Sequence, residues 1–504
     1  MSVATLRSIP EKTLDRDIPV QRSSKWTRIL ILLYLVSLPL VNPWVHGDGV
    51  GYYAYARATL IQRNLHFEKD WLAGNTTFRM GKVDESGSFF PYVYTRTGHL
   101  DNHFTVGPAI LWSPFLVATH LAVLGYDELG GHLPADGFSW PYRTAMALAT
   151  SLYGFLGLCL SFCLAREYFD DRWALIGTLG IWLASSLPVY MYFNPSWSHA
   201  HSCFAVALFI WYWNRTRAQR TLAQWILLGV LAGLMLNVYY PNVVFLSLPV
   251  VESVIGYAQI SRSPARGISS LNSLLLDNVL FASATLIAFL PTLITRQIVY
   301  GSPFNFGAYS RVPWNWTSPS FVLVLVSSDH GLVSWTPILV LSLVGLFFLY
   351  KRDRVLAGYL ILATLLFYYL IASYPFWDGL SSFGNRFFLS LVPVFVIGLT
   401  ASIDAFARAL GNILRAMRLS SAIIGLFALW NLAFIFQWGL HLIPVRGPIS
   451  WRDMAYNQVA VVPVKMGQSL KKYLLARQKL MGQIEEADTK QIESQQEKRD
   501  PQKP

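Results

Sequence analysis

Long uninterrupted apolar blocks are the feature that most limits how this chain folds. Residues 26–45 read WTRILILLYLVSLPLVNPWV, and residues 340–350 and 422–438 are as apolar. The hydrocarbon core of a bilayer is about 30 Å thick, and a helix of about 20 such residues crosses it. Only 13% of the residues are charged, against roughly a quarter in an ordinary soluble domain. The sequence therefore predicts an all-α polytopic membrane protein.

The apolar blocks predict about eleven transmembrane helices. They are expected near residues 27–45, 142–165, 173–193, 198–213, 222–239, 243–259, 278–298, 331–350, 355–373, 387–405 and 419–441. A further segment, residues 106–126, is either another span or a helix lying in the membrane surface. Short loops rich in Lys and Arg face the cytoplasm. If this segment does not cross, all the basic clusters share the side of the N-terminus, so we expect it not to cross.

This topology divides the chain into three parts. Residues 1–26 form a cytoplasmic N-terminal segment, and residues 27–443 form the transmembrane domain. Within that domain, residues 46–141 form one large first extracytoplasmic loop that carries juxtamembrane helices. Residues 444–504 form a polar C-terminal tail, expected to be partly helical and then disordered, and to lie outside by span counting. The N-terminal segment lacks a cleavage site, so the first block is predicted to be a retained anchor.

Charge and cysteine usage exclude two other classes of protein. The formal net charge is +12, but the Lys and Arg are spread through short loops between spans, so no nucleic-acid partner is expected. Cys159, Cys163 and Cys203 all lie in apolar blocks without metal-ligand spacing. They are interpreted as packing residues, and the partners expected from composition are membrane lipids.

Asp48 is the first candidate for chemistry. It follows the first apolar block at once, between Gly47 and Gly49, and a predicted interfacial helix comes next with Tyr52 on one face. A carboxylate held there could act as a general base that removes the proton of an acceptor, as the inverting sugar hydrolases do with water. Alternatively, Asp48 only caps the following helix, a position that Asp favours.

Five motifs resemble a known superfamily. GDGVGYYAYARATL, DNHFTVGPAILWSPFLVATHL, SHAHSCFAVALFIW, HGLVSWTPILVLSLVGLF and SFGNRFFLSLVPVFVIGL occur in this order between about Trp26 and Ile443. Together they resemble bacterial C-type glycosyltransferases, the relatives of protein-mannosyltransferase-like and aminoarabinose-transferase-like membrane enzymes. The resemblance implies a multispan helical bundle, a large first external loop, and a polyprenyl-phosphate-linked sugar donor in a bacterial inner membrane.

The resemblance also implies a role for Asp48. In the superfamily an acidic residue directly after the first span is the catalytic base, and Asp48 holds the matching position. Many relatives carry two adjacent acidic residues there, whereas Asp48 lies between glycines. Whether the base works alone therefore stays open.

Other external-loop residues are candidates for substrate binding. Arg386 and Arg311, with Arg296 behind them, could hold the phosphate, because a guanidinium offers a planar fork to its oxygens; interfacial anchoring is the alternative. Asp70 and Asp101 could bind a sugar hydroxyl or a metal, although loop acids are commonly only solvated. The remaining candidates are Tyr52 and His199.

No metal ligand is assigned from the sequence. His199 and His201, with His46 and His103, could supply a metal site, but no carboxylate follows them at a fixed spacing. Asp329 and His330 precede a span in a similar way. They either line the same cavity or, as the preferred interpretation, serve as packing residues. No cofactor is required on this interpretation, and a divalent cation is kept as an alternative.

The function predicted is a membrane glycosyltransferase acting on the extracytoplasmic face, with an acceptor that is a glycan, a lipid or a protein. The competing class is a lipid-linked-glycan transporter, flippase or polymerase without a base in the loop. Transporters usually place ionisable groups near mid-membrane. Here the predicted spans carry few charges at their centres and the polar residues concentrate in loops of one face, which favours chemistry at the interface.

Overall fold

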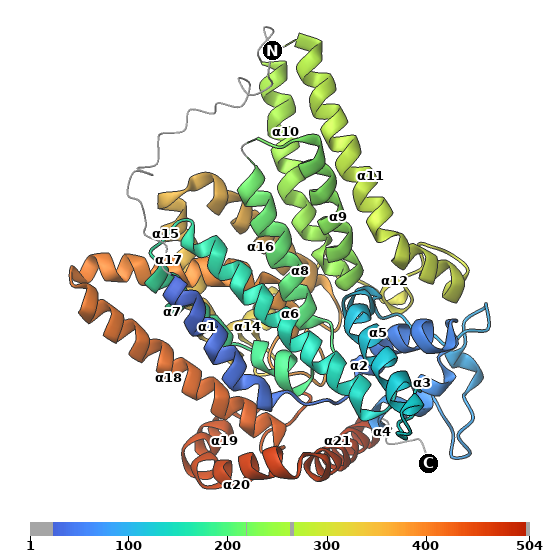
Figure 1. The fold of residues 1–504 in the computed structure, drawn as a ribbon. Helices are drawn as coiled ribbons and strands as arrows, with labels where there is room; N and C mark the ends of the chain where they lie inside the picture. Colours follow the sequence, from blue (N-terminus) through green and yellow to red (C-terminus); the bar gives the residue numbers. More distant parts are fainter. Residues whose placement is uncertain (1–23, 218, 263–266, 500–504) are drawn as a thin grey trace.

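The computed structural model describes residues 24–217, 219–262 and 267–499 (Figure 1). This part of the chain is almost wholly helical, with only two isolated β-bridges, Val83–Phe89 and Tyr94–Leu100, in the first loop. The predicted all-α class is confirmed at this level. The predicted N-terminal segment, residues 1–26, lies outside the described residues except for its last three, which begin α1 (Ser24–Ser37).

Seven of the described helices are long and apolar enough to cross a membrane. They are α5 (Gly107–Glu128), α6 (Trp140–Arg166), η6 with α10 (Tyr240–Ser261), α11 (Gly267–Tyr300), α16 (Arg354–Ser373), η8 with α17 (Arg386–Leu410) and α18 (Ile413–Gly439). Six coincide with predicted spans. The seventh, α5, is the segment expected not to cross, and its length and composition would allow it to do so. Its path relative to the bilayer stays a prediction.

The predicted count of about eleven spans is not confirmed. Four blocks form shorter helices, namely α1, α7 (Asp171–Leu183), α9 (Leu222–Val238) and α15 (Ile338–Arg352), with 14, 13, 17 and 15 residues. A fifth, α8 (His199–Thr216), has 18 residues but carries polar ones. Two of these blocks are interrupted by proline, at Pro39 in η2 (Leu38–Leu40) and at Pro188 before η5 (Val189–Phe193). Hydropathy counts apolar residues, but it does not record where a helix ends.

Small residues bring the long helices together. α17 packs against α15, α7 and α6, and a Cβ on Gly345 would lie 1.7 Å from the carbonyl oxygen of Gly398. α9 and α11 approach as closely, because a Cβ on Gly229 would lie 2.5 Å from the Phe281 carbonyl oxygen. Close backbone approach at small residues is the usual means of association for membrane helices.

The basic loops gather at one end of the bundle. Arg217 pairs with Asp353 at 3.0 Å, Arg352 with Asp404 at 3.7 Å, and Arg215 with Glu167 at 3.3 Å. These ion pairs join loops that the sequence places on a common side. The cytoplasmic assignment of that side remains a prediction from loop charge.

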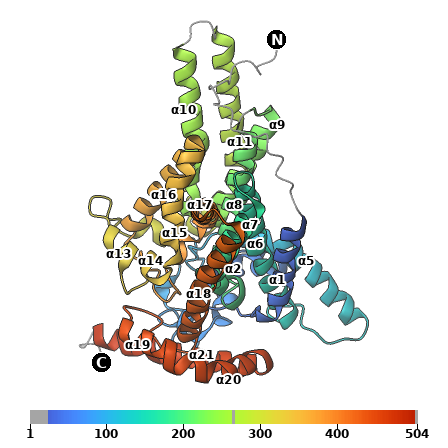
Figure 2. The same cartoon turned by 90° about the vertical axis from the view of Figure 1, so that its left-hand side faces the viewer.

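The first loop and the C-terminal helices share a different region, toward the lower end of the molecule in Figures 1 and 2. The first loop contains α2 (Asp48–Arg57), α3 (Glu68–Leu72) and α4 (Thr76–Arg79), and the tail contains α19 (Trp451–Tyr456), α20 (Val462–Leu475) and α21 (Arg477–Arg499). α21 packs against α4. This region positions the candidate site.

The described part of the tail contains the helices α19, α20 and α21, the last of which ends at Arg499. Residues 500–504 lie outside the described residues, so the expected disorder at the end of the tail stays a prediction. Polar groups of the described part have partners on the first loop and on the turn after α1: the Tyr473 hydroxyl donates to Leu40 O at 2.7 Å, and Thr76 N donates to Glu485 at 2.5 Å. Composition alone does not register such contacts.

Candidate active site

Asp48 and Arg386 form an ion pair in the structure. Asp48 is the first residue of α2, Arg386 begins η8 (Arg386–Leu391), and the Arg386 Nη1 to Asp48 Oδ2 distance is 2.9 Å. The Arg386 side chain is 9% exposed and the Asp48 side chain 34%. Gly47, not Asp48, holds the N-cap position. The Asp48 side chain is therefore directed to a partner on another element, as a residue kept only for capping would not be.

The glycines beside Asp48 are required by a neighbouring loop. Gly47 has φ of 55° and a Cβ there would lie 3.1 Å from the Trp197 ring. A Cβ on Gly49 would lie 1.9 Å from Ser196 Oγ. The Trp197 indole N–H also donates to His46 O at 2.8 Å. The loop before α8 therefore packs directly on the turn that carries Asp48 and fixes where the carboxylate lies.

Arg386 is held mostly by aromatic rings. Its guanidinium carbon lies 4.2 Å from the centre of the Trp197 ring and 5.5 Å from that of Phe387. Its Nε is buried and has no hydrogen-bond partner among the described residues. A buried guanidinium that keeps an unused donor can accept an anionic ligand in addition to Asp48, because its N–H groups form a planar fork.

Aromatic side chains from several loops continue around this pair. Tyr374 lies 6.0 Å from Phe387 and 6.2 Å from Tyr309, whose ring is 5.7 Å from that of His103, measured between ring centres. On the other side, His199 lies 6.3 Å from Phe387. These rings belong to α8, the segment after α11, the loop before η8 and the first loop, so these four segments meet beside the ion pair. Such a wall is apolar but carries polar tips that can bind hydroxyl groups.

Two basic side chains of the first loop lie near enough to Asp48 for its charge to affect their pKa values. Burial lowers the pKa of Lys82 to about 8, against the attraction of Asp48 and Asp101. Burial likewise lowers the pKa of His103 to about 4, so its ring is neutral at pH 7 although both carboxylates favour the charged form. Lys82 was not predicted, because nothing in its sequence context distinguishes it from a solvated lysine.

Tyr52 lies where the sequence suggested, one helical turn after Asp48. It is buried, and its hydroxyl accepts a hydrogen bond from Ser198 Oγ at 3.0 Å. Burial raises the pKa of Tyr52 above its usual range, and the negative charge of Asp48 raises it further. Tyr52 therefore stays protonated and can donate near the carboxylate.

Asp101 and Arg311 pair with each other rather than with Asp48. Arg311 Nη2 donates to Asp101 Oδ2. The Tyr300 hydroxyl donates to Asp101 Oδ1 at 2.5 Å. The Arg311 side chain is 59% exposed, so this second polar group lies at the surface of the site region. Its role in binding stays a prediction.

Two predicted ligands have structural partners instead. Both Asp70 oxygens accept from Arg57, at 2.5 and 2.6 Å, and both side chains are almost completely buried. Arg296 donates to Asn102 O at 3.0 Å and Phe104 O at 2.9 Å, and is fully buried. These groups hold the first loop onto α2 and α11. Both groups are engaged in these contacts, which a ligand would have to compete with; the substrate role of Asp70 and the secondary phosphate role of Arg296 stay predictions.

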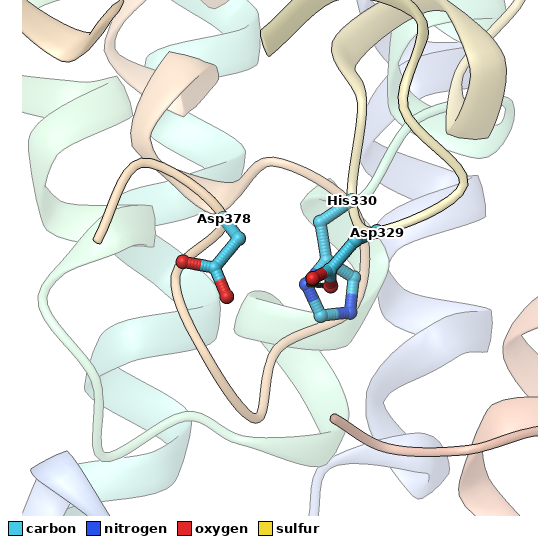
Figure 3. A group of neighbouring side chains, drawn as sticks. All are labelled: Asp329, His330 and Asp378. Carbon is cyan, nitrogen blue, oxygen red and sulfur yellow. Dashed lines mark ion pairs between the residues drawn. The ribbon is translucent and has the colours of Figure 1, made fainter. Parts of the chain in front are cut away.

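The histidines of the sequence motif do not form one cluster. His199 packs at 5.0 Å from Tyr190 and 5.7 Å from Tyr239. His201 faces Trp112 at 5.1 Å and Tyr153 at 5.7 Å. The one group of His, Asp, Glu or Cys with metal-ligand proximity in the described part of the chain is Asp329, His330 and Asp378 (Figure 3).

Comparison with known proteins gives distant structural likenesses. No protein-family model matches the chain, and no curated protein matches it in sequence. The fold is similar to an oligosaccharyltransferase of Archaeoglobus fulgidus, solved with Zn and sulfate, at 14% identity and TM-score 0.43 over 86% of this chain and 61% of the other. It is also similar to ArnT of Cupriavidus metallidurans bound to undecaprenyl phosphate, at 15% identity and TM-score 0.44 over 83% of this chain and 71% of the other.

The chain thus spans about three fifths of the archaeal oligosaccharyltransferase (61%). The function has to be inferred from the site residues of this chain.

Proposed function

We propose that this protein transfers a sugar from a polyprenyl-phosphate carrier to an acceptor on the extracytoplasmic face of the membrane, with Asp48 as general base. The observation that carries the proposal is the pairing of Asp48 with buried Arg386 at 2.9 Å, beside the end of the first apolar block. Base and phosphate-binding cation are the two groups such a transfer needs. The resemblance of the sequence motifs to C-type glycosyltransferases supports the same reaction.

Each bond change can be assigned to a group. The acceptor O–H or N–H loses its proton to the Asp48 carboxylate as its heteroatom attacks the anomeric carbon. The bond from that carbon to the phosphate oxygen breaks, and the phosphate leaves with the electron pair. Arg386 stabilises this developing negative charge. The leaving phosphate needs no protonating acid, so a single carboxylate is sufficient.

The ion pair also gives a reason why Asp48 would act only when donor is bound. Without donor, the carboxylate is bound to Arg386. A lipid phosphate that binds the same guanidinium competes with Asp48 and releases the carboxylate toward the acceptor. The aromatic residues around the pair exclude water, which would otherwise compete as an acceptor.

The test is a donor-turnover assay with purified full-length protein. Undecaprenyl-phosphate mannose and undecaprenyl-phosphate glucose, labelled in the sugar, serve as probes, and release of undecaprenyl phosphate is followed with and without crude envelope glycan as acceptor. We expect Asp48→Asn to lower turnover by about 10²- to 10⁴-fold, the range of general-base contributions. Asp127→Asn, at the exposed end of α5, is the matched control and should turn over normally.

Equal turnover in wild type and Asp48→Asn would remove the base assignment. Carrier binding without any release of undecaprenyl phosphate by the wild type would instead favour the transporter class.

A further inference from the structure

Asp329, His330 and Asp378 lie on two different loops. Asp329 and His330 are neighbours between α13 (Phe321–Val326) and α14 (Leu332–Trp335), while Asp378 belongs to the loop between α16 and η8 (Figure 3). One potential ligand atom from each lies within 4.8 Å of the others. The cluster uses neither Asp48 nor any histidine of the motif at residues 199–201.

His330 is the independent sign of a ligand at this place. Its side chain is 0% exposed, and neither ring nitrogen makes a hydrogen bond of good geometry among the described residues: Nδ1 lies 3.4 Å from Asp329 Oδ1, and the backbone of Asp378 is the only other polar neighbour recorded for the ring there. A buried imidazole without partners is unfavourable, because burial of a polar group costs free energy unless the group is bonded. One face of the ring is covered by Trp335, with ring centres 4.6 Å apart. A ligand at the ring edge would satisfy it.

The spacing suits a small cation. Four-coordinate Zn²⁺ has ligand bonds of about 2.0–2.2 Å, so adjacent ligand atoms lie about 3.3–3.5 Å apart. His330 Nδ1 and Asp329 Oδ1 are 3.4 Å apart, which already meets this requirement. Asp378 has only to approach by about an ångström or a little more for its oxygen to complete a three-ligand set.

The loops that carry these ligands are braced. The Trp335 indole N–H donates to Ser328 O at 3.0 Å, and Ser334 Oγ donates to Ser327 O at 2.6 Å. On the second loop, Asn385 donates to Trp377 O at 3.0 Å. Fixed loops of this kind hold ligands ready, since little chain order has to be created on binding.

We infer that Asp329, His330 and Asp378 bind one first-row divalent transition cation, for which Zn²⁺ and Mn²⁺ are suitable. One imidazole with two carboxylates is a ligand set these ions accept, whereas Mg²⁺ and Ca²⁺ prefer oxygen alone. Three protein ligands leave at least one coordination position for water or a phosphate oxygen. A Cβ on Gly379, the residue after Asp378, would lie 3.3 Å from Arg386 Nε. Because Arg386 is this close to the Asp378 loop, the cation and Arg386 would contact the same phosphate; this second step alone rests on the proposed function.

Cation binding by the full-length protein tests the inference without any transfer assay. The protein in detergent is stripped with a chelator and titrated with Zn²⁺ by calorimetry, and with Co²⁺, whose visible spectrum reports nitrogen and oxygen ligation. We expect one strong site in wild type. His330→Asn and Asp378→Asn should each weaken it by about 10- to 100-fold or more, the range seen when a single metal-site partner is removed.

Asp488→Asn is the matched control. Asp488 also lies beside two histidines, 2.6 Å from His441 and 3.8 Å from His46, so it reports whether a different His–Asp group binds the ion. Asn is chosen at position 330 because His330 has φ of 58°, a conformation that Asn tolerates. Absence of a site in wild type, equal affinity in all variants, or loss only in Asp488→Asn would each overturn the inference. Unfolding temperatures of the variants identify any loss that comes from misfolding.

Donor turnover with and without Zn²⁺ tests the second step separately. Stimulation that disappears in Asp378→Asn supports a phosphate-binding cation. A bound ion without effect on turnover would contradict that step and leave the site itself established.

Discussion

At the scale of single residues, the proposed function depends on the Asp48 carboxylate and the Arg386 guanidinium, which form an ion pair. Arg386 is buried against Trp197 and still keeps an unbonded Nε. Charge alone does not account for this environment, because an ammonium group has three N–H donors but no planar face that can stack on a ring. A planar fork that stacks on an aromatic ring and still offers donors is specific to arginine.

Arg386→Lys should therefore damage donor binding although it keeps the positive charge. A charge-assisted hydrogen bond contributes about 1.5–3 kcal/mol, so loss of one bond to phosphate should raise the KM for the donor about 10- to 100-fold. The measurement is a comparison of kcat and KM for the labelled donor. A KM equal to that of wild type would show that Arg386 does not bind the phosphate.

Asp70→Asn should act on stability and not on binding. Removing one member of a buried pair leaves the other charge unpaired and costs about 3–5 kcal/mol, and the Asp70 and Arg57 side chains are 3% and 2% exposed. We expect a clear fall in the unfolding temperature, with an unchanged donor KM in the protein that stays folded. A raised KM at an unchanged unfolding temperature would support the substrate role predicted from the sequence.

At the scale of elements, the position of α2 depends on two of its glycines, which allow neighbouring segments to pack closely against it. Gly49 and Gly51 face Ser196 and Phe104 so closely that a Cβ on either would lie 1.9 Å from a side-chain atom of its neighbour. The helix can therefore lie flat against the loop before α8 and the segment before α5. Any side chain at these positions would push Asp48 away from Arg386.

Gly49→Ala gives the corresponding prediction. Alanine normally stabilises a helix by about 1 kcal/mol relative to glycine, but here the overlap with Ser196 should lower both unfolding temperature and turnover. Gly425→Ala in α18 is the control, because a Cβ there meets nothing within 4 Å. It should be neutral or stabilising. The double variant Gly49→Ala, Ser196→Gly should recover part of the loss; no recovery would place the cause outside this contact.

At the scale of the whole molecule, the two ends of the chain meet. α21 contacts the first loop through Asp488, which lies between the side chains of His441 and His46. His46 is two residues before Asp48 in the sequence. Burial alone would raise the pKa of Asp488, but the hydrogen bonds from His441 and His46 bring it below its usual range. The carboxylate is thus charged and bound at neutral pH.

The direction in which docking of the tail depends on pH follows from the lowered pKa of Asp488. Docking of the tail by Asp488 should be complete above the unfolded-state value of about 3.9 and be lost only as the pH falls through the lower folded value. Asp488→Asn should release the tail at pH 7 as well. Limited proteolysis of α21 at pH 7 and at lower pH measures this; a tail equally protected in the variant would show that Asp488 does not hold it.

Part of this architecture could be predicted because it depends on local composition. The helical class and six of the long apolar helices follow from runs of apolar residues. The positions of Asp48 and Arg386 at span ends indicate a carboxylate and a cation separately. Their contact was not predictable, since it joins α2 in the first loop to the first residue of η8. The Arg57–Asp70 pair was missed for the same reason: sequence shows both charges but not which helices face each other.

The grouping of Asp329, His330 and Asp378 was also beyond the sequence. Asp329 and His330 are adjacent, and Asp378 follows after α14, α15 and α16, so no fixed sequence spacing indicates that the three residues form a group. Span lengths failed differently. The blocks that contain Pro39 and Pro188 change there from α-helix to short η segments, because proline restricts the backbone, and a count of apolar residues does not include this.

The distance in sequence between Asp48 and Arg386 has a consequence for synthesis. The ribosome delivers the first loop to its side of the membrane long before the segment that begins at Arg386, so a nascent chain carries the carboxylate without its guanidinium partner. The site is assembled only when the penultimate long helix, α17, has been inserted. A chain arrested before that point would display the first loop and still be inert.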